Sequence, residues 1–149
     1  IVGAIALLFV LRWLWQRRGG REAPRGHSAP RGALWGGLAG YTSFVAHAGG
    51  PPYQVYAMPL GLDPRAYTGT VVVFFAVVNY VKLVPYLLLG QFDAQNLGAS
   101  LLLAPVAVLF TFAGAALIRR MRAEVFYPVT YALTAAVGLK LVWDGLAGL

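Results

Sequence analysis

The chain has 149 residues, of which 59% are hydrophobic and only 11% are charged. A soluble domain carries about 25% charged residues, so this composition excludes an ordinary soluble domain and fits a chain surrounded by lipid. The absence of cysteine excludes disulfide bonds, thiolate metal sites and cysteine nucleophiles. The net charge is +7, but the basic residues cluster beside apolar runs, as in cytoplasmic loops of membrane proteins. We therefore expect a lipid bilayer as the surroundings and no nucleic-acid partner.

Residues 1–16 are apolar from the first position onward. They have no basic region in front and no small-residue cleavage site behind, which excludes a signal peptide. We predict that they are the end of the last helix of an N-terminal repeat, and that the rest of this repeat is missing. Residues 17–31 are rich in Gly, Pro and Arg. We expect a basic, flexible cytoplasmic linker; contact of its arginines with lipid headgroups is the alternative to simple solvation.

Residues 32–149 form the predicted C-terminal transmembrane repeat. Its first part, residues 32–62, is apolar but interrupted by the sequence Gly-Gly-Pro-Pro at 49–52, and two adjacent prolines exclude a continuous helix. The linker and the basic turn at 119–122 should both be cytoplasmic. If both are cytoplasmic, the number of membrane crossings between them must be even. The interrupted segment must therefore begin and end on the same side of the membrane. We expect a re-entrant hairpin, or two half-helices that meet at the Gly-Gly-Pro-Pro turn.

The remaining sequence contains apolar segments of the ~20 residues that a spanning helix needs. It predicts three spans, at residues 66–90, 94–118 and 123–146. Asp63 and Pro64 precede the first span as a helix cap and a proline at the first helical position. The predicted fold class is therefore an all-α integral membrane protein, a bundle of transmembrane helices that includes a broken or re-entrant pair.

A short internal similarity extends this prediction. Residues 11–15 (LRWLW) resemble residues 139–143 (LKLVW), and both stretches end an apolar helix. Parity places these two ends on opposite sides of the membrane, as in an inverted-topology repeat. The alternative is that aromatic and basic residues gather at membrane interfaces in any case. In the first interpretation, the chain is one half of an inverted-repeat transporter.

The interrupted segment is the first candidate site. Non-helical backbone at membrane depth is tolerated only where protein buries it or water reaches it, and the N-termini of half-helices attract anions. The two glycines would let the backbone approach a ligand, and the first free amides would belong to Tyr53 and Gln54. We therefore expect an anion near residues 50–54. The alternative is a kink that only packs.

Polar and small residues precede the break. Gly40, Ser43 and His47 follow at three- and four-residue spacing and should share a helix face. His47 is either a satisfied structural histidine or a donor in the pocket that carries a proton. Gly36 and Gly40 form a small-xxx-small pair, for which we favour close helix packing.

The next span carries an intramembrane lysine. A lysine within a span costs about 2.5–3.5 kcal/mol on insertion scales and usually faces the protein interior or a water-filled path. Asn79 and Lys82 are three residues apart and should point there together, on a stripe that includes Thr68. Lys82 could hold an anion as a point charge. The alternative is that Lys82 extends to the outer interface.

The candidate substrate-binding residues are therefore Ser43, His47, Gly49, Gly50, Pro51, Tyr53, Gln54, Thr68, Asn79 and Lys82. The sequence has no carboxylate pair, no Ser-His-Asp set, no phosphate loop and no cluster of metal ligands. We predict no catalytic residue, no metal and no cofactor, and we do not expect an enzyme.

Several stretches resemble the second half of the TauE/SafE sulfite-exporter family. They are residues 37–44 (GLAGYTSF) with 47–52 (HAGGPP), 66–70 (AYTGT), 79–86 (NYVKLVPY) with 90–92 (GQF), and 138–146 (GLKLVWDGL). The resemblance covers roughly residues 35–146. It implies a multi-pass protein of the bacterial inner membrane with two related halves, moving sulfite, sulfonates or other small anions. The first half of the family pattern is absent except for residues 1–15.

The functional hypothesis is an exporter or permease of sulfite, sulfonate or another small anion, working by alternating access around the broken helix. Its expected partners are the anion, the bilayer, the missing N-terminal half and, as a further option, copies of itself in a homo-oligomer. The alternative is a non-transporting membrane anchor or partner subunit of a larger complex. The break and Lys82 favour transport, because an anchor needs neither.

Overall fold

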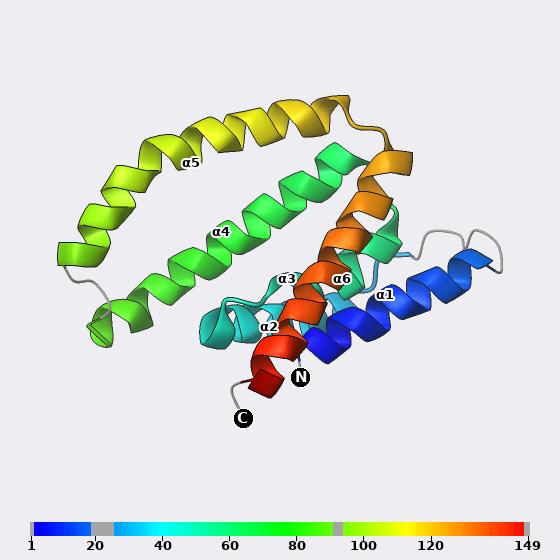
Figure 1. Ribbon diagram of the computed structural model, residues 1–149, viewed down its shortest axis with the longest axis horizontal. Helices are drawn as coiled ribbons and strands as arrows, with labels where there is room; N and C mark the ends of the chain where they lie inside the picture. Colours follow the sequence, from blue (N-terminus) through cyan, green and yellow to red (C-terminus); the bar gives the residue numbers. More distant parts are fainter. Residues whose placement is uncertain (1, 19–25, 91–93, 148–149) are drawn as a thin grey trace. The chain divides into compact units, whose positions relative to one another are not determined.

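The computed structural model of the protein describes residues 2–18, 26–90 and 94–147 (Figure 1). All regular elements in these ranges are helical, which confirms the predicted all-α fold. In chain order they are α1 (Val2–Arg18), α2 (Ala29–Ala46), α3 (Gly50–Ala57), the 3-10 turn η1 (Met58–Leu60), α4 (Pro64–Leu88), α5 (Ala94–Arg120) and α6 (Ala123–Ala147).

Three of these helices are long and apolar enough to cross a membrane: α4, α5 and α6. Their bounds lie within two residues of the three predicted spans. Pro64 is the first residue of α4, where its missing N–H costs nothing. The structure therefore confirms three helices at the predicted positions that are able to span a membrane. α1 is a shorter apolar helix.

Residues 19–25 of the predicted linker lie outside the described residues. α1 continues to Arg18, and α2 begins at Ala29 with a proline in its first turn. Residues 17–18 and 29–31 of the predicted linker therefore belong to the two helices.

The chain divides into two compact units. Unit 1 combines Ile1–Asp63 with Ala123–Leu149 and holds α1, α2, α3, η1 and α6. Unit 2 is Pro64–Arg122 and holds α4 and α5. The interrupted segment and the last span thus belong to one unit, although 60 residues of sequence separate Leu62 from Ala123 in this chain.

The centre of unit 1 is the pair α1 and α6, which lie against each other in Figure 1. A Cβ at Gly3 would be only 2.7 Å from the carbonyl oxygen of Gly138, so the two backbones touch. Near the other end of α1, the Trp13 ring stacks on Tyr131 with centroids 4.1 Å apart. The pairing order makes the two helices antiparallel. Small residues permit this approach, as in other membrane helix pairs.

Close packing was predicted instead at Gly36 and Gly40. The described part of the chain places no neighbouring helix against Gly40, because a Cβ there would meet nothing within 4 Å. A small-xxx-small spacing shows that two backbones can approach each other, but it does not identify a partner helix.

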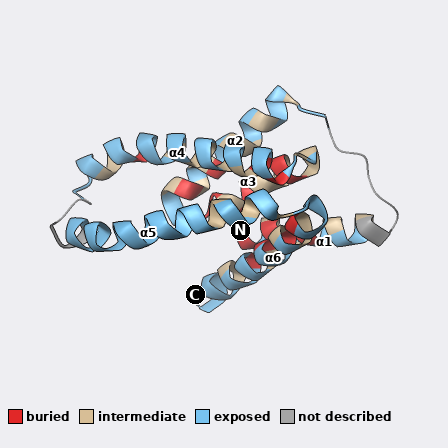
Figure 2. Ribbon diagram, turned by 90° about the horizontal axis from the view of Figure 1, so that it is seen from above, coloured by how far each residue is buried: buried red, intermediate tan, exposed pale blue. Residues whose placement is uncertain are grey.

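In unit 2, α4 and α5 run antiparallel, because the start of α4 lies at the end of α5. The Arg65 side chain donates from Nη2 to the carbonyl oxygen of Arg119 at 2.8 Å. A cationic side chain at a helix C-terminus satisfies a carbonyl that has no intrahelical partner. Figure 2 shows α5 exposed along its length, and its apolar window has no buried residue. Such a surface suits lipid as its surroundings.

Candidate functional site

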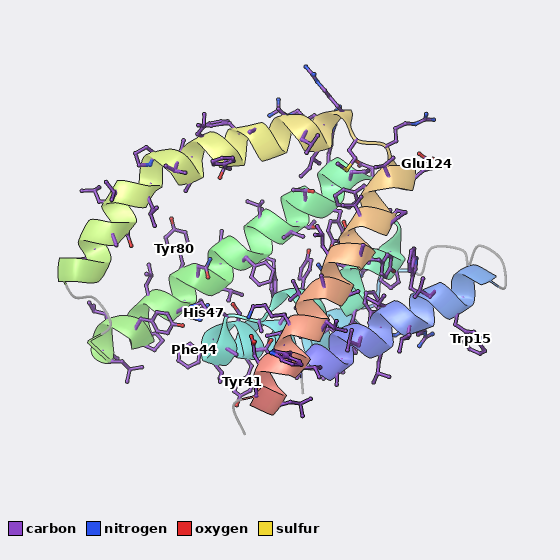
Figure 3. All side chains as sticks on the ribbon, viewed as in Figure 1. Trp15, Tyr41, Phe44, His47, Tyr80 and Glu124 are labelled. Carbon is purple, nitrogen blue, oxygen red and sulfur yellow. The ribbon has the colours of Figure 1, made fainter. Side chains whose placement is uncertain are left out.

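The first feature of the candidate site is the end of α2. His47 has a φ of 51° and lies in the left-handed region. Its N–H donates to the Ser43 carbonyl at 3.2 Å, and the N–H of Ala48 donates to the Thr42 carbonyl at 3.1 Å. These bonds satisfy carbonyls that the helix end would leave open. Figure 3 shows His47 at this helix end, beyond Phe44 and Tyr41.

The second helical piece begins directly after the break. α3 starts at Gly50 and carries Pro51 and Pro52 in its first turn. The prediction of two helical pieces near the Gly-Gly-Pro-Pro sequence is therefore confirmed. The turn lies earlier than expected, however. It falls on His47, after the end of α2, whereas Gly49 already has helical angles (φ −74°, ψ −17°).

Proline chemistry explains the position of the break. In a continuous helix, the rings of Pro51 and Pro52 would clash with the carbonyl groups of residues 47 and 48. The chain must turn at those residues, and it turns at His47. The glycines at 49 and 50 therefore do not provide the unusual backbone conformation; in the described residues, the positive φ values of glycine are at Gly61 and Gly90.

The amides at the start of α3 also differ from expectation. The Tyr53 N–H is not free, because it donates to the Gly49 carbonyl at 3.3 Å and closes the first turn of the helix. Prolines have no N–H, so Gly50 carries the one amide hydrogen among the first three residues of α3. A Cβ at Gly50 would meet nothing within 4 Å. Open space therefore remains at this helix start.

Burial separates the residues before the break. Ser43 is only 5% exposed, whereas His47 is exposed. The predicted common face of Gly40, Ser43 and His47 does not extend to His47, because a left-handed residue after the helix end no longer follows the helical spacing. Ser43 thus places a buried hydroxyl group one turn before the break.

α3 packs mainly against α2 and α1, and a hydrogen bond also connects it to α6. The Thr134 hydroxyl donates to Gln54 Oε1 at 2.5 Å, and its oxygen is also 2.7 Å from the Thr130 carbonyl oxygen. Thr134 is 3% exposed. Our sequence prediction did not include Thr134; a hydroxyl near the middle of an apolar span was the available indication.

The far end of α3 returns to the beginning of α2. The Tyr56 hydroxyl donates to the Ser28 carbonyl at 3.2 Å and accepts from the Ser28 N–H at 3.4 Å. A Cβ at Gly32 would be 3.1 Å from the Tyr56 ring. Just beyond η1, the Leu62 carbonyl accepts a bond from the Tyr127 hydroxyl at 2.6 Å. The α2–α3 segment is therefore a hairpin whose two ends lie together, beside the first turns of α6.

The other candidates lie on α4, in unit 2. Lys82 is 6% exposed, and its Nζ is 5.9 Å from the centroid of the Tyr86 ring, within the range of a cation–π contact. A lysine that extends to the interface would keep its ammonium exposed, so burial favours the interior alternative. Asn79 is exposed and does not share the burial of Lys82, against expectation. The Thr68 hydroxyl donates to the Pro64 carbonyl of its own helix at 2.8 Å.

The structure thus brings together the candidates from Ser43 to Gln54 in unit 1, and it places Thr68, Asn79 and Lys82 in unit 2. A common pocket for the two sets stays a prediction. Within the described ranges, no three side chains of His, Cys, Asp or Glu are grouped so that they could hold a metal ion. Lys140, which was not a candidate, pairs with Asp144 at 2.7 Å on the exposed side of α6.

An all-helical fold with three potential spans defines a class, the helical integral membrane proteins, and a broken helix is a recurring feature of transporters within this class. The comparison with protein families agrees: the model of the family described as "Sulfite exporter TauE/SafE" matches residues 1–141. The chain belongs to this family, whose members are transporters rather than enzymes. The match confirms the resemblance and includes the first helix. Neither the curated proteins nor the solved structures provided a match.

Proposed function

We propose that this protein moves sulfite, a sulfonate or another small anion across the bacterial inner membrane as a multi-pass exporter or permease. The observation that carries the proposal is the helix break between α2 and α3, at His47–Gly49. Helices of membrane proteins are interrupted at depth only where the free backbone is buried in protein or lines a path for water and solutes. An anchor or partner subunit needs no such break.

The hairpin geometry supports a re-entrant path. Because Tyr56 binds the backbone of Ser28, the segment returns to the level at which it began. Cytoplasmic placement of the two basic segments likewise requires a segment that begins and ends on one side of the membrane. Inner placement of the Arg119–Arg120 end of α5 also agrees with the Arg65 contact, since Arg65 lies in the first turn of α4. Contacts in both units are therefore consistent with one topology.

An anion would find two kinds of positive potential. The first is the start of α3, which carries the Gly50 amide and the positive end of the helix dipole. The second is the buried ammonium of Lys82, which is costly within a span unless it serves a partner or a path. In the proposed mechanism the Ser43 hydroxyl donates to an anion at the start of α3, and Lys82 attracts an anion to α4. His47, Gly49, Pro51, Tyr53, Gln54, Thr68 and Asn79 remain candidate neighbours of the path.

Alternating access needs a second element that faces the break. We propose that a related N-terminal repeat supplies it, with α1 as the last helix of that repeat, or that a second copy does so in a homo-oligomer. The antiparallel contact of α1 with α6 supports the first version, because corresponding helices of inverted repeats point in opposite directions.

The first prediction tests transport and Lys82 together. The full-length protein, reconstituted in vesicles loaded with sulfite, should release the anion, and Lys82→Ala should reduce the rate at least tenfold because the buried charge is lost. The measurement is sulfite efflux over time, repeated with a small sulfonate.

Lys140→Ala is the matched control, since Lys140 is a lysine of the same protein that is 74% exposed and paired with Asp144. It should transport at the wild-type rate. Wild-type efflux from the Lys82→Ala protein would remove Lys82 from the path. No flux of either anion through the wild-type protein would contradict the transport proposal itself.

A further inference from the structure

A buried hydroxyl of α6 contacts the short helix of the hairpin. Thr134 lies near the middle of α6, is 3% exposed, and its Oγ1 is 2.5 Å from Gln54 Oε1. The two residues are 80 positions apart in sequence. This hydrogen bond links a potential membrane span to the half-helix that begins at the break.

The hydroxyl cannot donate to both of its neighbours. Thr134 Oγ1 also lies 2.7 Å from the Thr130 carbonyl oxygen, and a hydroxyl group has a single hydrogen. When the hydrogen points to Gln54, it holds α3. When it points to Thr130, the bond to Gln54 Oε1 is lost, but the hydroxyl remains satisfied. When α3 detaches from α6, the buried Thr134 hydroxyl therefore still has a hydrogen-bond acceptor in α6.

A turned amide gives a second attached arrangement. If the Gln54 amide rotates by 180°, its NH₂ group donates to Thr134 while Thr134 donates to Thr130. Both arrangements need the Thr134 hydroxyl and the Gln54 amide, and both are removed by the same substitutions. The contact can thus open and close by rotation of side-chain groups alone.

The backbone offers a candidate hinge on each side of the α3–η1 segment. α3 has eight residues and lies between two residues with left-handed angles, His47 (φ 51°) before it and Gly61 (φ 63°) after η1. Hinges are commonly a few residues at element ends that absorb changes of φ and ψ. The Tyr56 bond ties α3 to α2, within the hairpin, whereas the Gln54 bond ties it to α6.

We propose that Thr134 and Gln54 form a releasable latch between α6 and α3, and that opening of this latch is part of the conformational change that carries the anion past the break. Thr134 is therefore a positioning residue, acting on the anion through α3. The inference rests on the proposed function, although the latch itself can be detected without transport.

The test uses Thr134→Val, which keeps the shape of the side chain and removes the hydroxyl, with Thr134→Ser as the matched control that retains it. Because the chain has no cysteine, Val55→Cys on α3 provides a single thiol for labelling in the full-length reconstituted protein. Interhelical hydrogen bonds in membrane proteins are worth about threefold to twentyfold in an equilibrium constant. The labelling rate should rise by that factor with Thr134→Val and stay unchanged with Thr134→Ser.

Sulfite efflux gives the second readout. Thr134→Val should change the maximal rate by about threefold to twentyfold, and the half-saturating concentration by less than twofold, since the residue does not touch the anion. Gln54→Ala should reproduce the labelling effect, and the double variant should add nothing to it.

Equal labelling of the Thr134→Val and wild-type proteins would overturn the latch, as would a Thr134→Ser protein that behaves like Thr134→Val. Additive effects of Thr134→Val and Gln54→Ala would do so too. If labelling changes as expected but no anion is moved, the latch stands and the transport proposal fails. If anions are moved but labelling is unchanged, the reverse holds.

Discussion

His47 adopts a conformation that residues other than glycine rarely adopt. Left-handed angles cost an L-residue about 1–2 kcal/mol, although histidine is among the residues found there more often than most. Glycine would end α2 without that cost, and Gly61 ends η1 in this way. Non-glycine residues with such angles often occur at functional sites. A substitution of the exposed His47 therefore distinguishes an effect of its side chain on stability from an effect on transport.

We predict that His47→Gly raises the free energy of unfolding by about 1 kcal/mol, because glycine adopts the left-handed conformation freely. Thermal unfolding in detergent micelles measures this change. The control is Ala46→Gly, one residue earlier and still helical, which should lower stability by about 0.5–1 kcal/mol. Destabilisation by His47→Gly would show that the imidazole holds the break together. Lower sulfite efflux from a more stable His47→Gly protein would assign the side chain to transport.

At the level of elements, the contact between α1 and α6 sets the architecture of unit 1. Gly3 and Gly138 bring the two backbones together, Ala6 is completely buried beside them, and Tyr131 packs against Phe9 and Trp13. A contact of this kind depends on shape, because lipid surrounds apolar side chains as well as a neighbouring helix does. It should therefore be sensitive to added volume.

Gly138→Leu should lower the thermal stability of the protein in detergent by about 1–3 kcal/mol. A Cβ at Gly138 would lie 3.0 Å from the Cβ of Ala6 and 3.3 Å from the Gly3 carbonyl oxygen, so a larger side chain forces the helices apart. Gly145→Leu in the same helix is the control: a Cβ there meets nothing within 4 Å. It should be neutral or slightly stabilising through helix propensity. Equal effects of the two substitutions would argue against a close contact of α1 and α6.

For the whole molecule, the decisive question is which ends of the helices share a side of the membrane. In the proposed topology, the positive-inside rule places the start of α2 and the end of η1 on the cytoplasmic side and the end of α4 on the outer side. The contact between Arg65 and Arg119 fits the same orientation within unit 2.

Single cysteines test this topology directly. Ser28→Cys and Asp63→Cys should react with a membrane-impermeant thiol reagent from the cytoplasmic side, and Leu89→Cys at the end of α4 from the opposite side. The wild-type chain has no cysteine and serves as the blank. Reaction of Ser28→Cys and Asp63→Cys from opposite sides would mean that the α2–α3 segment crosses the membrane, and the re-entrant proposal would then be wrong.

Much of the fold follows from local chemistry and was therefore predictable. A spanning helix needs ~20 apolar residues in a row, and two adjacent prolines exclude a continuous helix, so the spans and the broken segment are visible in the sequence. The family resemblance likewise rests on short contiguous stretches. These features need no knowledge of which segments touch.

The tertiary structure decided what depends on distant partners. The bond between Thr134 and Gln54, the glycine contact of α1 with α6 and the burial of Lys82 without Asn79 have no local pattern that predicts them. The position of the break was also refined, since the left-handed turn falls on His47, Gly49 precedes α3 with helical angles, and Gly50 is the first residue of α3. Apolar segments show that a chain enters lipid, but which faces then meet is decided by side-chain shape and hydrogen bonding.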